Sequence, residues 1–325
     1  MHTSWDVIIV GGGSAGLSAA LQLGRSRRRV FVLDSGEPRN RFAQHMHGVL
    51  SRDGWSPLEL LAAGRAEVAR YGVVVRSADV ASATRGDDGF EFVLDDGERH
   101  VGRRVLVATG VRDDLPEIPG LADHWGKGAA VCPYCDGWEA RDRRIAVLAS
   151  GATSVHQAQL LRQLSPEVTY FVNGSELPAE AHAGLTARGI AVEPREVVGV
   201  AADEQGGLRG IRLADGSEAA VDAIFLHPRP VPNDAVLRAL GAVVATGQAA
   251  HPGAANVEWI EVDTNGRTSV PGLWAAGNVV SARTSVPMAS GAGNAVGAVI
   301  NGDLVEEEVR LALAAAASGM PLSVA

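Results

Sequence analysis

The chain has 325 residues, a formal net charge of −9 and 46% hydrophobic residues. At roughly 100–200 residues per domain, this length predicts about two domains. An acidic chain is a poor general partner for nucleic-acid phosphates. No apolar run approaches the ~18 residues of a membrane span, and the N-terminus lacks the regions of a secretory signal. We therefore expect a cytoplasmic protein without nucleic-acid or membrane partners.

Glycine and cysteine are distributed unusually. The 39 glycines make up about 12% of the chain, where ~7% is usual. The two cysteines lie within one stretch of four residues, Cys132-Pro133-Tyr134-Cys135. They cannot build a disulfide framework. In a reducing compartment such a pair favours redox or metal chemistry.

The N-terminal segment reads as a βαβ unit. An apolar run at 7–10 is followed by GGGSAG at 11–16, a helix-compatible stretch at 17–25, a second apolar run at 30–33, and Asp34. This order matches the G-x-G-x-x-G signature of dinucleotide-binding folds, in which an acid follows about 20 residues on. The strand, helix and acid in register make the match specific.

Each position of this signature has a physical role. Gly11 permits the tight turn, Gly13 lets the backbone approach a pyrophosphate, and Gly16 lets helix and strand pack closely. The N–H groups at the start of the helix are free to bind the anion. The Asp34 carboxylate can accept hydrogen bonds from a ribose.

Further strands follow before the cysteines. Alternation at 90–94 and the turn residues at 95–97 predict a hairpin. The apolar run at 105–108 predicts a third buried strand that leads into Thr109 and Gly110.

A second, degraded copy of the βαβ unit lies after the cysteines. We expect a strand at 145–148, a helix through Gln163 and a strand at 168–172. The three glycine positions hold Ala149, Gly151 and Ser154. The residues after the second strand, Asn173 to Glu176, provide neither an acid at the ribose position nor arginines for a 2′-phosphate. The pattern predicts a nucleotide-type fold without a tight NADPH site.

The C-terminal third is again rich in glycine. Residues 271–278 read PGLWAAGN, and residues 290–294 are expected to open a helix. Residues 303–317 are helical by propensity, and the glutamates at 306–308 are expected on a solvated face.

Four motifs together resemble the low-molecular-weight thioredoxin reductases: GGGSAG after the first strand, VATG in mid-chain, a C-x-x-C followed by Asp-Gly, and a late GLWAAGN. The resemblance covers nearly the whole chain. It implies an α/β fold with two Rossmann-like nucleotide-binding domains. An FAD domain would comprise residues 1–112 and 246–325, and an inserted NAD(P)-type domain, residues 113–245, would carry the C-x-x-C. It also implies a homodimer.

Within that superfamily the sequence is more similar to dithiol oxidases of the gliotoxin and holomycin type. The resemblance rests on PRNR at 38–41, His45, His47 and Asp53-Gly54, on the CPYC string, and on the absence of a basic run after Val172. Three sites depart from the patterns. Reductases usually carry aspartate where this chain has Asn278 and an Arg-Gln pair near Ser285-Val286, and many dithiol oxidases carry histidine where it has Asp136.

The resemblance also implies the cofactor contacts. An asparagine at 278 can hydrogen-bond ribityl hydroxyls but removes a negative charge. The loop holding His45 and His47 would lie near the isoalloxazine, or these histidines bond the backbone of their own loop. The implied FAD contacts are Gly11, Gly13, Ser14, Ala15, Gly16, Asp34, Arg41, Val80, Thr109, Gly110, Gly277 and Asn278.

The cysteine pair has a readable chemistry. Two thiols at i and i+3 can close without moving the backbone, and a helix starting there favours a lowered pKa for Cys132. A zinc site would need two further ligands, for which His124 is the nearby candidate. A purely structural disulfide would constrain little, because the loop that it closes is so short.

By resemblance, Cys135 faces the flavin, Cys132 is the exchange thiol and Asp136 is the proton relay. A carboxylate beside the pair can move the proton that thiol–disulfide exchange must transfer. The alternative for Asp136 is an acid that stabilises a helix N-terminus.

An intact C-x-x-C and intact FAD motifs beside an eroded NADPH site predict an FAD-dependent dithiol oxidase. It would form a disulfide in a small-molecule dithiol and pass two electrons to O₂, giving H₂O₂. The alternatives are an NAD(P)H- or ferredoxin-dependent thioredoxin-type disulfide reductase and a non-catalytic flavoprotein redox sensor. No metal is expected.

Overall fold

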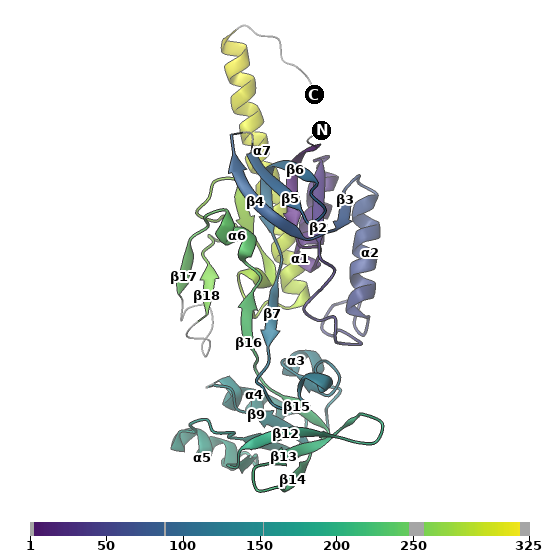
Figure 1. Cartoon of the computed structure of the whole chain (residues 1–325), viewed down its shortest axis with the longest axis vertical. Helices are drawn as coiled ribbons and strands as arrows, with labels where there is room; N and C mark the ends of the chain where they lie inside the picture. The colour runs from purple at the N-terminus through teal and green to yellow at the C-terminus, as the bar shows by residue number, and fades with distance from the viewer. Residues whose placement is uncertain (1–2, 88, 152, 247–256, 319–325) are drawn as a thin grey trace.

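The computed structural model describes residues 3–87, 89–151, 153–246 and 257–318. Two sheets with their helices lie at opposite ends of an elongated molecule (Figure 1). Strands β7 (Val111–Asp114) and β16 (Arg229–Pro232) run between them and pair antiparallel. The chain therefore passes twice through one narrow connection.

The larger sheet has the order β3-β2-β1-β6-β5-β4, and β19 pairs with β6. Its strands are β1 (Thr3–Val10), β2 (Val30–Asp34), β3 (Val74–Ser77), β4 (Val80–Gly86), β5 (Gly89–Leu94), β6 (Arg99–Val107) and β19 (Leu273–Ala275). β1, β2, β3, β6 and β19 run parallel to one another, and the predicted hairpin is the antiparallel pair β5–β6. The C-terminal third thus contributes a strand to the N-terminal sheet.

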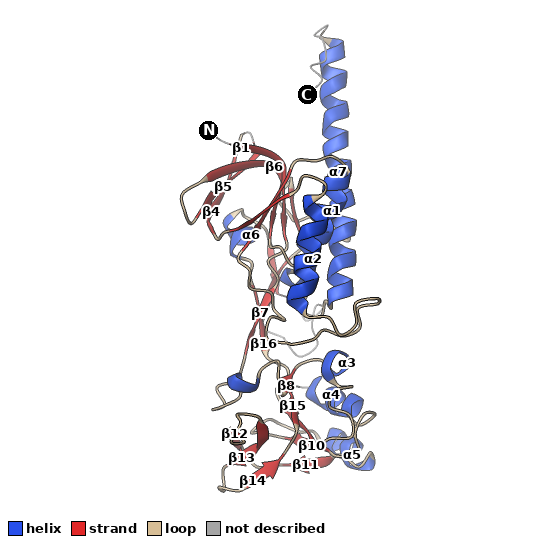
Figure 2. Ribbon diagram, turned by 90° about the vertical axis from the view of Figure 1, so that its right-hand side faces the viewer, coloured by secondary structure: helices blue, strands red, loops and turns tan. Residues whose placement is uncertain are grey.

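Strand β1 is buried on both faces, as its continuous apolar run predicts. Val7 and Ile9 pack into one core cluster with α1 (Ser14–Arg25), α2 (Pro57–Ala69) and α7 (Val286–Ala317). Ile8 and Val10 pack into a second cluster on the opposite face. Figure 2 shows the three helices together on one side of the sheet.

The prediction that residues 290–294 open a helix is wrong, because α7 begins at Val286 and runs through them. Its glycines serve helix packing instead. A Cβ added at Gly293 would lie 1.9 Å from the Ala15 carbonyl oxygen, and one at Gly297 would lie 3.0 Å from that of Ala19. Small residues here let the backbones of α1 and α7 touch.

The glutamates of α7 were expected on a solvated face; this is wrong for Glu307, which is half-buried, and holds for Glu308, which is exposed although it is paired. Glu307 bonds Arg103 at 2.7 Å and also pairs with Arg104, and Glu308 pairs with Arg28. Glu306 is exposed. These ion pairs tie α7 to β6 and to the turn after α1.

The smaller sheet is parallel, with the order β11-β10-β9-β15-β8. Its strands are β8 (Ala129–Ala130), β9 (Ile145–Leu148), β10 (Val168–Phe171), β11 (Ala191–Glu193) and β15 (Ala223–Phe225). The helices of this end are α3 (Pro133–Asp136), α4 (Thr153–Leu161) and α5 (Ala179–Ala187). The predicted second βαβ unit is β9–α4–β10, which confirms an α/β fold with two Rossmann-like units.

The remaining elements complete the two ends. They are β12 (Val197–Ala202), β13 (Leu208–Leu213), β14 (Glu218–Ala220), β17 (Val244–Thr246), β18 (Glu258–Ile260), α6 (Ala235–Ala239) and the short helices η1 (Ala122–His124) and η2 (Gly277–Val279). Within the described ranges, no helix is both long and apolar enough to cross a membrane.

Candidate active site

A cleft of about 2260 Å³ receives residues from both sheets. Val10 and Leu33, at the carboxyl ends of β1 and β2, line it together with Leu148 at the carboxyl end of β9. In open α/β sheets, ligands bind at this edge. The cleft also brings together most of the predicted site residues: Gly11, Gly13, Ser14, Ala15, Asp34, Arg41, Val80, Thr109, Gly110, Asn278, Cys132, Cys135 and Asp136.

The first glycine turn has the geometry that a pyrophosphate site requires. Gly11 adopts φ +106°, and a Cβ there would lie 2.4 Å from the Ala108 carbonyl oxygen. At Gly13 an added Cβ would meet no described atom within 4 Å, so the backbone is open toward the cleft. Among the described residues, no side chain caps the start of α1 and no acid lies in its first turn. The residues present therefore fit the diphosphate of FAD.

Of the described residues predicted to contact FAD, Gly16 and Gly277 do not line the cleft. A Cβ at Gly16 would lie 1.9 Å from the Gly11 carbonyl oxygen. Gly277 adopts φ +78°, and its added Cβ would lie 3.0 Å from that of Ala15. Both glycines permit close packing behind the turn.

The Asp34 carboxylate is held in place at the end of β2. It accepts a 3.0 Å hydrogen bond from the Gly12 backbone N–H and pairs with Arg65 of α2. No sequence pattern singles out Arg65, because a contact between a strand end and the middle of the next helix has no local signature. A carboxylate anchored in this way presents its oxygens where the fold places a ribose.

Thr109 and Gly110 are locked to the returning chain. The Thr109 hydroxyl donates to the Asn233 carbonyl at 2.6 Å, and the Asn233 amide donates to the Thr109 carbonyl at 3.0 Å. The Asn233 backbone N–H also donates to the Gly110 carbonyl at 3.0 Å. The small residues predicted at this strand end therefore bond the start of the β7 segment to the end of the β16 segment, the two segments that run between the sheets.

Asn278 uses its amide nitrogen to shape the loop before α7. Its Nδ2 lies within 3.0–3.3 Å of the carbonyl oxygens of Ser281, Ala282 and Thr284. An ionised aspartate has no hydrogen to donate, so it could not make these bonds. The asparagine thus fixes the wall of the cleft, whereas the sequence suggested only contacts to a ribityl chain.

Two arginines of the loop after β2 have different roles. Arg41 lines the cleft and lies over the Phe42 ring, 4.3 Å from its centroid. Arg39 donates to both oxygens of Asp113, at 2.6 and 2.8 Å, and to the Ala282 carbonyl at 2.8 Å. In the sequence, Arg39 stands out only as part of the PRNR motif. It ties this loop to β7 and to the loop before α7.

Cys132 and Cys135 form a disulfide with Cα atoms 5.2 Å apart. Cys132 lies directly before α3, as predicted, and its carbonyl oxygen accepts 3.0 Å hydrogen bonds from the N–H groups of Cys135 and Asp136. Because α3 has only four residues, its dipole exerts only a small field at the Cys132 sulfur. No group of three metal-ligating side chains suited to an ion lies within the described ranges.

Asp136 is mostly withdrawn from water beside the disulfide. Burial raises the pKa of its carboxyl to about 6, the neighbouring Glu139 carboxylate adds to this rise, and His47 opposes it. Buried carboxyls with such values act as proton donors and acceptors near neutral pH.

The two loop histidines have different partners. His45 Nδ1 lies 3.0 Å from the Gly54 carbonyl oxygen, within its own loop. His47 lies between two acids, with Nδ1 3.4 Å from Asp53 and Nε2 3.5 Å from Glu139. His47 therefore connects this loop to the segment after α3.

The second nucleotide turn is occupied by its own side chains. The Ser150 N–H donates to the Ser154 hydroxyl at 3.0 Å, and the Ser150 hydroxyl accepts from the His227 N–H at 3.2 Å. Asn173, at the position of a ribose-binding acid, accepts from the Val197 N–H at 2.9 Å. These polar groups of the turn are thus engaged within the chain, and the absence of a tight NADPH site stays a prediction.

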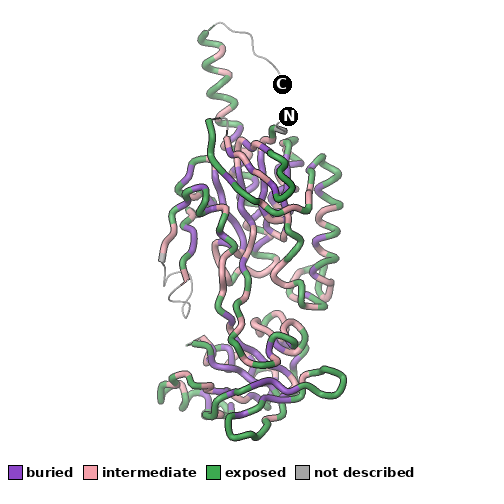
Figure 3. The backbone as a smooth tube through the Cα atoms, in the orientation of Figure 1, coloured by how far each residue is buried: buried purple, intermediate pink, exposed green. Residues whose placement is uncertain are grey.

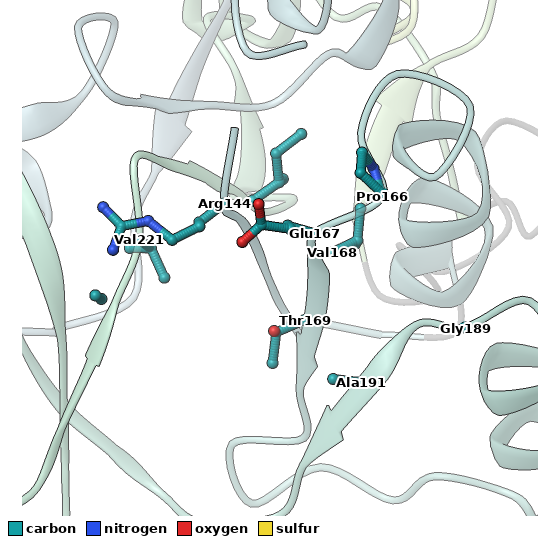
Figure 4. A pocket seen from close by; sticks show the side chains of 10 residues that line it. Arg144, Pro166, Glu167, Val168, Thr169, Gly189, Ala191 and Val221 are labelled. Atoms are coloured by element: carbon teal, nitrogen blue, oxygen red, sulfur yellow. The ribbon is translucent and has the colours of Figure 1, made fainter. Parts of the chain in front are cut away.

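A smaller pocket of about 280 Å³ lies at the opposite end of the second sheet (Figure 4). Ile145 and Val168, the first residues of β9 and β10, line it. Its charged lining residues are Glu167 and Arg144, and Arg144 is paired with Asp222. The amino ends of parallel strands are not where this fold binds ligands, so the large cleft is the candidate site.

Comparisons with known proteins agree with this geometry. Residues 5–316 match the family described as pyridine nucleotide-disulphide oxidoreductase. Thioredoxin reductase tcpT of Claviceps purpurea is 35% identical over 237 residues, which is 70% of this chain and 74% of that protein. Thioredoxin reductase sirT of Leptosphaeria maculans is 34% identical over 69% of this chain and 74% of its own length.

Solved structures extend the likeness to the whole fold. The crystal structure of HlmI superposes with a TM-score of 0.89 at 43% identity and covers 97% of both chains. An oxidoreductase from Agrobacterium tumefaciens superposes with a TM-score of 0.85 at 36% identity, covering 93% of this chain and 99% of its own. The predicted resemblance to thioredoxin-reductase-like enzymes is confirmed. The chain belongs to the pyridine nucleotide-disulphide oxidoreductase family and is a flavin-dependent thiol–disulfide oxidoreductase.

Proposed function

We propose that the protein is an FAD-dependent dithiol oxidase that closes a disulfide in a small-molecule dithiol and uses O₂ as the electron acceptor. One observation carries the proposal. The Cys132–Cys135 disulfide and Asp136 open to the same cleft as the intact first glycine turn, while side chains of the chain itself engage the second nucleotide turn. A thiol substrate in the cleft can thus reach the disulfide, and we infer that a thiol rather than NADPH donates the electrons.

The thiol chemistry balances as two successive exchanges. A substrate thiolate attacks Sγ of Cys132, breaking the disulfide and releasing the Cys135 thiolate. The second substrate thiolate attacks the substrate sulfur bound to Cys132, releasing that cysteine and closing the substrate disulfide. Two electrons then reside on the cysteine pair, and two protons have left the substrate. Asp136 accepts a proton from the attacking thiol.

When bound, FAD would supply the two-electron redox chemistry that links the reduced cysteine pair to O₂, which would take up two electrons and two protons to give H₂O₂. We propose that residues 1–112 and 246–325 hold the cofactor and that the inserted segment 113–245 carries the cysteines. Support comes from the shared sheet of β1, β6 and β19. The proposed contacts are Gly11, Gly13, Ser14, Ala15, Asp34, Arg41, Val80, Thr109, Gly110 and Asn278, with Gly16 and Gly277 shaping the turn behind them.

The test separates the two possible electron donors. Flavin-loaded protein is mixed under nitrogen with NADPH or with dithiothreitol, and its visible absorbance is followed. We expect the dithiol to bleach the flavin and NADPH to leave it oxidised. Admitting air should then restore the absorbance and yield H₂O₂ equimolar with the disulfide. Rapid bleaching by NADPH with turnover of thioredoxin would instead establish a disulfide reductase.

We also propose that the protein is a homodimer joined through the end of α7. This end projects beyond the larger sheet and is largely exposed (Figure 3). Val305, Val309 and Leu313, spaced by four residues along one side of the helix, are 43%, 51% and 67% exposed. Contiguous exposed apolar side chains mark association surfaces, and a second copy offers a matching stripe.

The double variant Val309→Asp/Leu313→Asp is expected to sediment as a monomer at micromolar concentration, because two buried charges would lose their water at such an interface. Ala314 is exposed and lies outside the stripe formed by Val305, Val309 and Leu313. Ala314→Asp is therefore the matched control and should remain dimeric. Equal sedimentation of the double variant and the wild type would contradict this placement.

A further inference from the structure

Gln157 is a buried polar residue that the mechanism above does not use. It lies in the middle of α4 and is 2% exposed. Its Nε2 donates a 2.7 Å hydrogen bond to the carbonyl oxygen of Val131, the residue directly before Cys132. The helix of the second nucleotide unit thus contacts the backbone of the redox pair.

Folding alone does not account for a glutamine here. Its Oε1 is buried and has no hydrogen-bond partner among the described residues. A buried carbonyl oxygen without a partner costs free energy that an apolar side chain of the same length avoids. A polar residue retained at such a position points to a role for the one bond that it makes.

That bond, together with the hydrogen bonds to the Cys132 carbonyl, holds the backbone on both sides of the Cys132 Cα. The peptide plane before the Cys132 Cα is held by Gln157 through the Val131 carbonyl. The plane after it is held by the bonds from Cys135 and Asp136 to the Cys132 carbonyl. With both planes fixed, at φ −111° and ψ 111°, the direction of the Cα–Cβ bond is set. Only the χ1 rotation remains to place Sγ.

The position of Gln157 relates this bond to the erosion of the second nucleotide site. In a nucleotide-binding unit the helix after the glycine turn presents its first N–H groups to the ligand. Here Ser154 engages that turn, and the same helix instead supports the cysteine segment.

We propose that Gln157 is a positioning residue that fixes the Cys132 Sγ for attack by the dithiol. The inference rests on the proposed function and on the assignment of Cys132 as the exchange thiol. Small displacements of reacting atoms reduce rates strongly, so the loss of this bond should slow exchange while substrate binding in the cleft is retained.

The decisive variants are Gln157→Met, which keeps the length and removes the donor, and Gln163→Met, the control at an exposed glutamine just after α4. We measure anaerobic flavin reduction by dithiothreitol and the rate at which the reduced protein is alkylated at Cys132, read by peptide mass spectrometry. For Gln157→Met we expect the limiting rate of flavin reduction and the alkylation rate to fall by about 10-fold to 100-fold. The dithiothreitol concentration at half-maximal reduction rate, the flavin content and the melting temperature should be nearly constant, and Gln163→Met should match the wild type. Equal rates in Gln157→Met and wild type would overturn the proposal.

A second variant covers the case in which Gln157→Met does not fold. Burial raises the pKa of a carboxyl, so in Gln157→Glu the protonated acid can donate to Val131 at low pH and the ionised form cannot. Its alkylation rate relative to wild type should therefore approach unity as the pH falls and depart from unity as it rises. A pH-independent ratio would contradict the proposal. If dithiothreitol fails to reduce the wild-type flavin, the proposed function is lost, but the alkylation rates still decide the role of Gln157.

Discussion

Replacing either cysteine with serine is expected to lower dithiol turnover by at least about a thousandfold, because residues that act as one unit fail together. The flavin content should remain, since the cofactor contacts that we propose lie in other elements. Stability should change little, because the Cys132–Cys135 loop is short and its closure constrains the unfolded chain weakly. Steady-state oxidation, visible absorbance and thermal unfolding measure the three effects.

The single variants also test which cysteine exchanges with substrate. In Cys135→Ser the remaining Cys132 thiol should form a mixed disulfide with a bulky aromatic disulfide reagent faster than the Cys135 thiol does in Cys132→Ser. The reason is that Cys132 is assigned to the substrate side and Cys135 to the flavin side. Stopped-flow absorbance of the released aromatic thiolate gives both rates, and the reverse order would exchange the two roles.

Replacing Asp136 with asparagine is expected to lower kcat/KM for the dithiol by about 100-fold to 10,000-fold, the range for loss of a positioned acid–base group. In the wild type, kcat/KM should decline below pH 6, because the Asp136 carboxyl has a pKa of about 6 and only its ionised form can accept a proton. In Asp136→Asn, the pH profile of kcat/KM should lack this acidic limb.

The matched control is Glu139→Gln, which removes the carboxylate that helps to raise the Asp136 pKa. Glu139→Gln should turn over the dithiol at the wild-type rate, and the acidic limb of its kcat/KM profile should move to lower pH. An unchanged limb in Asp136→Asn would assign it to another group.

Asp136→Asn should also stabilise the folded protein at neutral pH. The folded-state pKa of Asp136 lies above the ordinary value of 3.8, so folding disfavours the charged form. The resulting loss of folding free energy in the wild type is absent below pH 3.8, grows as the pH rises, and reaches its full size above pH 6. Its upper bound is about 3 kcal/mol. Denaturant unfolding of Asp136→Asn and wild type at pH 7 and pH 3 measures it, and equal differences at both values would contradict the assignment.

Local patterns predicted the elements in which we propose the cofactor contacts. The apolar run of β1, the glycine turn and the spacing to Asp34 encode a βαβ unit, since period, turn residues and helix start are all local properties. The hairpin β5–β6 and the start of α3 at Pro133 follow from turn chemistry in the same way. Glycines in α7 misled the prediction because a glycine that permits helix packing and one that forms a turn look alike in sequence.

The sequence by itself determined the fold class, the two nucleotide-type units and the chemistry of the cysteine pair. Only the tertiary structure decided what surrounds them: the Arg65 partner of Asp34, the carbonyls around Asn278, the burial of Asp136 and the bond from Gln157 to Val131. Most of these contacts join residues from different elements, so the spacing of residues in the sequence does not predict them. Burial, which raises the pKa of Asp136, depends on how the cysteine segment packs and is not a property of neighbouring residues in the chain.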